Sequence, residues 1–532
     1  MDGRQEQKAF WIVLLALLLL TRIPVLTSYF GIDNVNLAFA LETFDPRVHQ
    51  PQPPGYPFFV AYARVINFFF HDAAPTFAVI TVLGSGLSVA LVFVLGSRMF
   101  SPWAGAASAL LLLVNPVFWH SASDANGGPL RLHLALFSLL IAYCCWRCWN
   151  GDKQFAIWSG VAFGIGSGFR PDLIAFLVPL WLTCLWVGTK SWRTVFKAIA
   201  ILAATVAIWA GATIYAVGGF ADFASFQQLL VDYAVNQSQP GSIVLGSAST
   251  GWLRQISRLA IWNSLAVVGW ICAVPFWFRN RDRLPLIGSV GAFFFLWLVP
   301  GLLVQALIHV DAPGHTLFSI PALCLLGGFV LSQVRGKEMI LSAALILNVA
   351  LFLNFLAVPA GAAPAAGRSI KNAFIFGVTE SSLGHARAMD EISRATLKEV
   401  AEFTAVERPT VIITTDTHEQ NWFMNWRILR YYLPTQDVWV LYNRLPQKRA
   451  EAIRRHSRID VRNTAPVKIP IFREGRILWL IEPGSPIHKE IATKQKLTGG
   501  RYVFYSDITP ESPTFTIDEF EIVPSLFGFL PN

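Results

Sequence analysis

The stretch TFAVITVLGSGLSVALVFVLGS, residues 76–97, runs for 22 residues without a charged side chain. A helix of about 20 mostly apolar residues is long enough to cross a lipid bilayer. The stretch therefore predicts a membrane-spanning helix. Ten further runs of this kind predict spans over residues 9–26, 103–120, 129–149, 155–169, 171–188, 194–217, 259–279, 284–308, 316–334 and 338–358.

The composition of the 532 residues agrees with a membrane protein, because only 14% of them are charged, against about 25% in soluble domains. The charge is uneven: residues 1–358 hold 34 charged side chains and residues 359–532 hold 41. A transmembrane domain over 1–358, a Pro/Ala/Gly linker over 359–370 and a soluble domain over 371–532 are therefore expected. Strand-like runs at 410–416, 437–442 and 476–482 alternate with helix-like stretches, which favours an α/β layer for the soluble domain. Acceptor recognition or regulation is the hypothesis for its role.

Basic residues fix the expected orientation, because short loops rich in Lys and Arg stay in the cytoplasm. With the N-terminus inside and residues 56–70 as an interfacial or re-entrant helix, 13 Lys/Arg fall in inner loops and 7 in outer ones. This assignment gives about eleven transmembrane helices plus one interfacial helix and places the C-terminal domain outside. It also explains most of the net charge of +9, so nucleic acid is not expected as a partner.

The six cysteines all lie inside apolar stretches. That placement indicates packing residues, and it predicts neither a disulfide framework nor a zinc ribbon.

The outer loops gather the polar residues that are candidates for chemistry. Asp33 follows the first span and faces a proline-rich segment, HQPQPPGYP, that begins at His49. A carboxylate there suits a general base, but a helix cap at Asp33 and a solvated His49 explain the same residues. Asp124 lies in the second outer loop and Arg258 in a later one.

Two further outer segments leave alternatives open. Arg170 and Asp172 interrupt an apolar stretch, where the guanidinium suits a phosphate or an ion pair with Asp172. His309, Asp311 and His315 suit a metal site, but a polar hairpin cap containing Pro313 and Gly314 explains them as well. No second ligand-dense segment accompanies them, so a divalent metal is not supported and no cofactor is certain.

The order of these motifs resembles the GT-C-type membrane glycosyltransferases, of the protein O-mannosyltransferase and aminoarabinose-transferase-like group (glycosyltransferase family 39-like). The resemblance covers about residues 9–358. It is carried by Asp33 in the first outer loop, the HQPQPPGYP run, Gly96-Ser97-Arg98-Met99-Phe100, and Asn115-Pro116 before Asp124.

The resemblance implies transfer of a sugar, hexosyl or pentosyl, from a polyprenyl-phosphate carrier to a lipid, glycan or protein acceptor on the outer face of the plasma (inner) membrane, with inversion. It implies that Asp33 is the catalytic base, with Asp124 as a second acidic position. His49, Arg170, Asp172, Arg258, His309 and His315 are then candidates for binding the carrier phosphate or substrate. This chain has Asp33-Asn34 where the family commonly has Asp-Glu, and it departs from the aromatic–arginine pair expected near Gly314-His315. Those differences weaken the case for a metal and leave the acceptor unspecified.

Two functions of other classes compete with the transferase. A lipid or glycolipid transporter would move its substrate without covalent change, but no inverted repeat is visible between the groups of spans. A non-catalytic membrane scaffold would bind a partner through its outer domain. The two differ from a transferase in that neither forms a new glycoside.

Overall fold

A computed structural model describes most of the first 354 residues and parts of the remainder. The described residues are 3–46, 50–52, 54–123, 127–224, 251–275, 287–308, 310, 312–354, 378–405, 410–415, 426–436, 438–443, 469–470, 476–480, 495–496, 503–507, 514–515 and 520–524. The chain divides into two compact units. The helical unit comprises Met1–Thr27, Pro54–Phe220 and Leu230–Ala386, and the C-terminal unit comprises Ser28–Pro53, Ala221–Leu229 and Arg387–Asn532.

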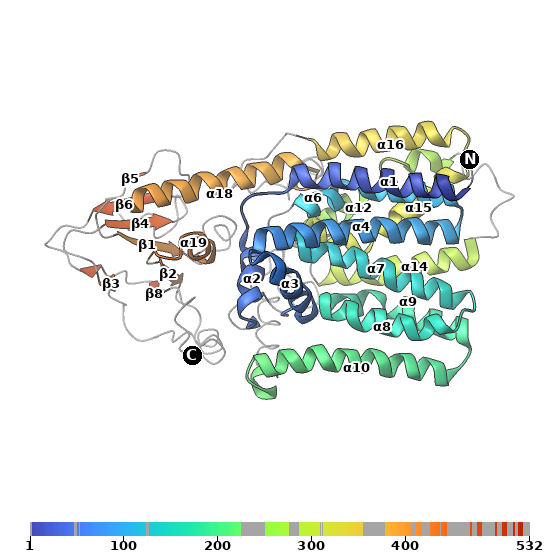
Figure 1. The fold of residues 1–532 in the computed structure, drawn as a ribbon, viewed down its shortest axis with the longest axis horizontal. Coiled ribbons are helices and arrows are strands. Elements are labelled where there is room, and N and C mark those ends of the chain that lie inside the picture. The colour runs from blue at the N-terminus through green and yellow to red at the C-terminus, as the bar shows by residue number, and fades with distance from the viewer. Residues whose placement is uncertain are drawn as a thin grey trace. The chain divides into compact units, whose positions relative to one another are not determined.

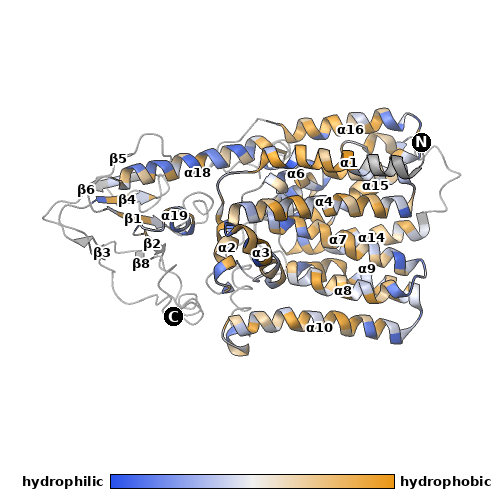
Figure 2. Ribbon diagram, in the orientation of Figure 1, coloured by the Kyte–Doolittle hydropathy of each residue, from blue (hydrophilic) through white to orange (hydrophobic). Residues whose placement is uncertain are grey.

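The helical unit is a bundle of apolar helices (Figures 1 and 2). Its α-helices are α1 (Gly3–Arg22), α3 (Pro57–Phe70), α4 (Ala73–Met99), α5 (Pro102–Leu113), α6 (Pro116–Ser123), α7 (Gly128–Trp149), α8 (Gln154–Phe169), α9 (Asp172–Thr189), α10 (Trp192–Ala216), α12 (Gly251–Ser264), α14 (Ile287–Leu307), α15 (Ile320–Ser332) and α16 (Lys337–Phe352). Three 3-10 helices accompany them: η1 (Ile23–Val25), η3 (Ile271–Ala273) and η5 (Pro313–Phe318). The predicted helical membrane fold is confirmed.

Among the described residues, five helices are long and apolar enough to cross a membrane by themselves: α4, α7, α9, α10 and α14. The pair α5 and α6 raises the number to six if it forms one bent span. The expected interfacial segment forms α3, an apolar helix of 14 residues that is shorter than a span. The total of eleven spans stays a prediction.

Two predicted spans differ from single straight helices. The span expected over 103–120 is bent by 50° between α5 and α6, because Pro116 has no N–H with which to continue the helix. The span expected over 259–279 ends as an α-helix at Ser264 and continues as turns and η3. Gly269 lies in this irregular segment, and a Cβ atom there would stand only 2.9 Å from Ala344 Cβ on α16. The close approach to α16 therefore needs a glycine.

Close contact between helices depends on glycine at two more positions. A Cβ atom on Gly105 of α5 would lie 2.6 Å from the carbonyl oxygen of Phe93 on α4. A Cβ atom on Gly328 of α15 would lie 2.4 Å from the carbonyl oxygen of Ala104 on α5. Small residues at such contacts let membrane helices pack backbone against backbone. Helices α4, α5 and α15 thus form a tightly packed layer.

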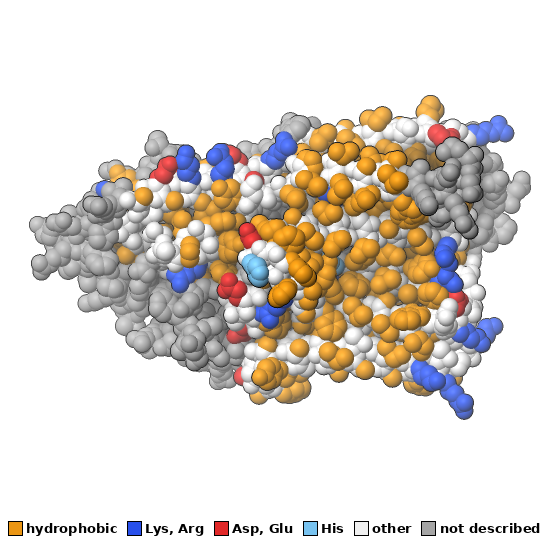
Figure 3. Space-filling view, viewed as in Figure 1, with side chains coloured by type: hydrophobic (Ala, Val, Ile, Leu, Met, Phe, Trp, Pro, Cys, Tyr) orange, Lys and Arg blue, Asp and Glu red, His pale blue; other side chains and the backbone are white. Residues whose placement is uncertain are grey.

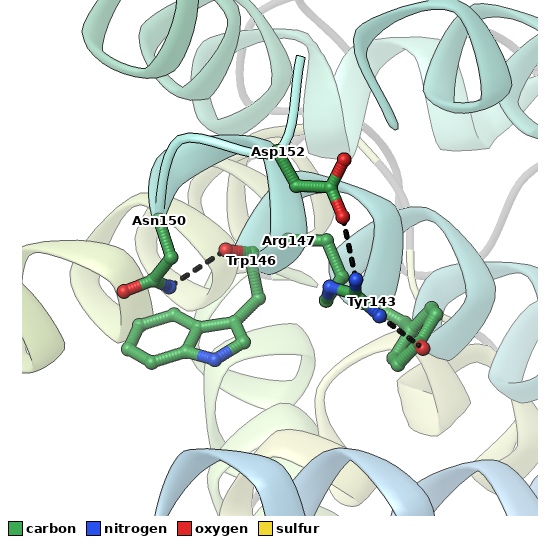
Figure 4. A network of polar contacts seen from close by, with 5 residues as sticks. All are labelled: Tyr143, Trp146, Arg147, Asn150 and Asp152. Atoms are coloured by element: carbon green, nitrogen blue, oxygen red, sulfur yellow. Dashed lines mark hydrogen bonds and ion pairs between the residues drawn. The ribbon is translucent and has the colours of Figure 1, made fainter. Parts of the chain in front are cut away.

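Basic side chains gather at one end of the helical unit, while hydrophobic side chains cover its middle on the face drawn in Figure 3. Arg98, at the end of α4, lies over the ring of Tyr143 on α7 at 5.7 Å, and Lys337, at the start of α16, lies 4.7 Å from the ring of Trp103 on α5. In the α7–α8 turn, Arg147 donates to Asp152 at 2.5 Å and to the Tyr143 hydroxyl at 3.1 Å (Figure 4). All belong to loops or helix ends that the charge pattern assigns to the inner side.

The C-terminal unit contains a sheet whose strands are β1 (Thr410–Thr415), β2 (Val438–Asn443), β4 (Arg476–Leu480), β5 (Gln495–Lys496), β6 (Val503–Asp507) and β8 (Phe520–Pro524), in the order β5-β6-β4-β1-β2-β8. The short strands β3 (Ile469–Pro470) and β7 (Thr514–Phe515) pair separately. Strand β1 is parallel to both neighbours, β2 and β4. Consecutive residues Val411, Ile412 and Ile413 are all buried, as expected for a central strand covered on both faces.

The described part of this unit also contains the helices α2 (Ile32–Glu42), α18 (Leu383–Thr404), which begins in the helical unit, and α19 (Trp426–Tyr432). The strands expected at 410–416, 437–442 and 476–482 correspond to β1, β2 and β4. Contacts group residues 28–53, the first outer loop, with the C-terminal unit, although composition alone had placed them with the spans. The linker expected at 359–370 lies outside the described residues.

Candidate functional site

The structure describes five of the eight candidate residues. Asp33 belongs to the C-terminal unit, whereas Arg170, Asp172, Arg258 and His315 belong to the helical unit. The remaining three, His49, Asp124 and His309, lie outside the described residues.

Asp33 lies in the first turn of α2, and its side chain is partly exposed. Gly31 is the N-cap residue, and its carbonyl oxygen accepts from the N–H of Val35 at 3.0 Å. The positive end of the helix dipole stabilises a carboxylate in this turn. The N-cap residue of α2 is therefore Gly31, and Asp33 lies two residues further on, within the first turn. Its role as a general base stays a prediction.

The segment after α2 is bridged to the second residue of the proline-rich run. Asp45 N–H donates to the Gln50 carbonyl at 2.7 Å, and Gln50 N–H donates to the Asp45 carbonyl at 3.0 Å. These two bonds form an antiparallel bridge that ends just before Pro51. Gln50, within the proline-rich segment, is thus paired with Asp45.

Arg170 forms the ion pair that the sequence left open. Its Nη2 lies 2.6 Å from Asp172 Oδ2, and its Nε lies 3.1 Å from Oδ1, so the guanidinium and the carboxylate meet through two parallel bonds. The ring of Tyr56, at the start of α3, lies 5.7 Å from the guanidinium carbon. The side chain of Arg170 is 8% exposed. Asp172 and Tyr56 therefore hold this arginine in place at the α8–α9 turn.

Arg258 is held by a residue that sequence reasoning missed. Its Nη2 lies 3.0 Å from Glu380 Oε1, and the two side chains are 9% and 14% exposed. The indole ring of Trp262, one turn further along α12, lies 5.8 Å from the guanidinium carbon. Glu380 precedes α18 and is 122 residues away in sequence, so no local pattern pointed to it.

Next to Arg258, a chain of amide side chains links α12 to the segment that bears His315. Gln255 Nε2 donates to the backbone carbonyl of Gln305 at 2.5 Å. Gln305 Nε2 in turn donates to the backbone carbonyl of His315 at 2.5 Å. Both glutamines are buried. They satisfy one carbonyl group in the last turn of α14 and one in η5, and so connect η5 to α12.

The segment 312–318 also contacts α6 and α7. A Cβ atom on Gly314 would lie 2.6 Å from Arg131 Cδ and 3.1 Å from Ser121 Oγ, so Arg131 packs directly on the backbone of η5. Arg131 is 7% exposed. His120 precedes Ser121 on α6. The centre of its ring lies 6.1 Å from that of His385 on α18. Arg131, His120 and His385 were not among the predicted site residues.

These contacts bring three buried arginines, Arg131, Arg170 and Arg258, to one end of the helical unit. Arg131 begins α7 and Arg170 ends α8, which packs antiparallel to α7, and Arg258 is connected to η5 through Gln255 and Gln305. Buried guanidinium groups suit the binding of a phosphate that gains charge during a reaction. No group of three or more His, Cys, Asp or Glu side chains with metal-site geometry occurs among the described residues.

Comparison with known proteins finds one matching family model and several similar folds. The family described as dolichyl-phosphate-mannose-protein mannosyltransferase matches residues 51–215. The fold is similar to that of ArnT from Cupriavidus metallidurans in its apo state, with a TM-score of 0.58 and 13% identity over 96% of this chain and 99% of ArnT. For ArnT bound to undecaprenyl phosphate the TM-score is 0.57, with 12% identity over 94% of this chain and 98% of ArnT. No curated protein sequence matches the chain.

The matched family segment begins in the proline-rich run and ends in α10, so it includes Arg131, Arg170 and Asp172. The structural similarity extends over the C-terminal unit as well. The resemblance to GT-C-type membrane glycosyltransferases, inferred from the order of the motifs, is confirmed by these two findings.

Proposed function

We propose that this protein is a glycosyltransferase that takes its sugar from a polyprenyl-phosphate carrier. The observation that carries the proposal is the collection of Arg131, Arg170 and Arg258 at one end of an ArnT-like helical unit. ArnT was crystallised with undecaprenyl phosphate, a ligand with an apolar chain and an anionic head. A largely transmembrane protein with buried guanidinium groups at one end suits a ligand of that kind.

In the proposed reaction, an oxygen of the acceptor attacks the anomeric carbon of the donor sugar from the face opposite the carrier phosphate. The bond between that carbon and the phosphate oxygen breaks, so the configuration inverts. The bonding electrons leave with the polyprenyl phosphate, and guanidinium groups compensate its developing charge. Asp33 takes the proton of the acceptor hydroxyl, whose pKa in water is far too high for unaided attack at neutral pH.

The assignment of Asp33 is tested with purified protein, lipid-linked hexose and pentose donors, and separate lipid, glycan and peptide acceptors. Asp33→Asn is expected to lower the rate of glycoside formation by at least about a hundredfold, the usual range for loss of a general base. The matched control is Glu42→Gln, which changes an exposed carboxylate in the last turn of the same helix.

Equal rates for Asp33→Asn and the wild type would show that another residue is the base. Movement of intact donor across a vesicle membrane without glycoside formation would instead favour a transporter. The hexose and pentose donors, assayed side by side, define the class of sugar.

We further propose that the end of the helical unit with the three arginines faces the outside of the cell, and that the N-terminus is cytoplasmic. The support is the concentration of Lys and Arg at the opposite end. A cysteine at Lys190, in the α9–α10 turn, is expected to react with a membrane-impermeant reagent only after the cells are opened. A cysteine at Lys398, an exposed position on α18, is expected to react in intact cells, and the reverse pattern would overturn the orientation.

A further inference from the structure

Three successive backbone N–H groups just before α2 are all bound by side chains of the C-terminal helices. The N–H groups of Ser28 and Tyr29 donate to Oδ1 of Asp390 on α18, at 2.9 and 2.7 Å. The N–H of Phe30 donates to the hydroxyl oxygen of Tyr432 on α19 at 2.7 Å. These partners are more than 360 residues away in sequence.

Aromatic side chains also connect α2 and the residues before it to α19. The Tyr29 and Tyr432 rings are 5.5 Å apart, and the rings of Phe30 and Tyr431 are 6.0 Å apart. Phe39, near the other end of α2, meets Tyr431 edge to face at 5.7 Å. Edge-to-face and tilted aromatic pairs each add to the energy of area burial. Tyr431 and Tyr432 of α19 therefore contact aromatic rings at both ends of α2.

The anchored segment leads directly into the turn that bears Asp33. Only Gly31 and Ile32 separate Phe30 from Asp33, and the first helical hydrogen bond of α2 starts at Gly31. A short connection of this kind transmits a displacement of residues 28–30 to the Asp33 carboxylate. A shift of about 1 Å in a reacting group is enough to cost about a hundredfold in rate.

We propose that Asp390 and Tyr432 are positioning residues that set the place of Asp33 for the transfer reaction, so that the C-terminal unit forms part of the catalytic machinery. This inference rests on the proposed function. Neither residue touches the reacting atoms. Asp390 acts through a charge-assisted bond to two amides, and Tyr432 acts through a neutral one.

The experiment compares Asp390→Ala and Tyr432→Phe with the wild type in the full-length protein. Glu391→Ala is the matched control, because Glu391 is the next residue on α18 and pairs with exposed Arg394 instead. Asp390→Asn, which keeps an acceptor oxygen, is the conservative variant. Two quantities are measured: hydrogen exchange of the amides of residues 28–30, and kcat and KM for the lipid-linked donor.

Asp390→Ala and Tyr432→Phe are expected to speed exchange at residues 28–30 at least tenfold and to lower kcat between about tenfold and a hundredfold. KM for the donor is expected to change less than threefold. Asp390→Asn should recover much of kcat, and Glu391→Ala should resemble the wild type in both measurements. A variant that merely unfolds would lose protection throughout the C-terminal unit, including β1 and β4, and such a global loss counts against a positioning role.

Unchanged exchange at residues 28–30 would show that Asp390 and Tyr432 do not hold these backbone groups, and it would overturn the proposal. Faster exchange with wild-type kcat overturns the positioning role while leaving the proposed transferase intact. A wild-type protein that transfers no sugar from any lipid-linked donor overturns the proposed function, and the inference falls with it. The first two outcomes are thus distinguishable from failure of the function itself.

Discussion

Nη2 of Arg22 donates a 2.7 Å hydrogen bond to the backbone carbonyl of Leu113, 91 residues later in the chain. Leu113 is the last residue of α5, and its carbonyl has no helical donor because the chain bends before Pro116. In return, Trp119 Nε1 of α6 donates to the carbonyl of Thr21 at 2.7 Å. The end of α1 and the α5–α6 bend therefore satisfy each other's backbone groups.

Replacing Arg22 tests this exchange. Arg22→Met keeps most of the apolar stem but leaves the Leu113 carbonyl buried without its donor. We expect a loss of about 1.5–3 kcal/mol in the free energy of unfolding, the range for hydrogen bonds to charged groups. Unfolding is measured in detergent micelles by denaturant titration.

Arg193→Met is the matched control, because Arg193 is an exposed arginine in the first turn of α10. A change within about 0.5 kcal/mol is expected there. Equal effects of the two substitutions would show that the Arg22 bond contributes nothing specific.

The apolar pattern of the sequence predicts most of the helices and the central strands. Membrane-spanning helices and strands covered on both faces are continuous apolar runs, and such runs can be read directly from the sequence. Helices α4, α7 and α10 and strands β1 and β4 follow the predicted runs closely. The bend between α5 and α6 was not predicted, although Asn115-Pro116 was noted as a motif. Hydropathy is unchanged across a bend, so the apolar pattern did not show it, and Pro116 was the signal in the sequence that could have.

The site was less accessible to sequence reasoning than the fold. The Arg170–Asp172 pair is local and was one of two alternatives weighed. The Arg258–Glu380 pair and the anchoring of residues 28–30 join segments that are far apart in sequence. Sequence spacing carries no information on such contacts, because they depend on how the helices fold together.

Glycine at the contact between α5 and α15 gives a second prediction for stability. A Cβ atom on Gly328 would stand 2.4 Å from a backbone carbonyl, which cannot move aside as a flexible side chain does. Gly328→Ala is therefore expected to destabilise the protein by about 1–3 kcal/mol, as overpacking does. The measurement is the midpoint of thermal unfolding in detergent.

Gly211→Ala on α10 is the matched control, since nothing lies within 4 Å of the added Cβ atom. It is expected to be neutral or to stabilise the helix by up to about 1 kcal/mol. A stabilising effect of Gly328→Ala would contradict the close packing of α5 and α15.

The Arg258–Glu380 pair is suited to a double-mutant cycle. Glu380→Gln leaves a mostly buried guanidinium without its carboxylate, and removing one partner of a buried pair costs about 3–5 kcal/mol. The double variant Arg258→Gln, Glu380→Gln is expected to lose less than the sum of the two single changes, by about 0.5–3 kcal/mol. Denaturant unfolding of the four proteins gives the coupling.

Glu402→Gln provides the comparison for an exposed pair. Its partner is Lys398, and both side chains are about two-thirds exposed, at 67% and 66%. Such a pair contributes about 0.5 kcal/mol or less. Strict additivity in the Arg258–Glu380 cycle would mean that the pair does not interact in the folded protein.

Tyr432 gives a prediction for alkaline pH. Burial raises the pKa of its hydroxyl above the ordinary value of 10.0, because a phenolate is poorly solvated inside the protein. The folded state therefore favours the neutral form. Its contribution to stability is complete below pH 10 and is lost as the pH rises from there through the higher pKa of the folded state.

The measurement is tyrosinate absorbance of the wild type minus that of Tyr432→Phe, recorded as the pH is raised. The difference is expected to stay near zero through pH 10, where exposed tyrosines ionise, and to grow only above it. Tyr29→Phe serves as the control, because Tyr29 contacts the ring of Tyr432, whereas the hydroxyl that accepts from the Phe30 N–H is that of Tyr432. A difference curve with its midpoint near pH 10 would show that Tyr432 is solvated, and would count against the bond from the Phe30 N–H to its hydroxyl.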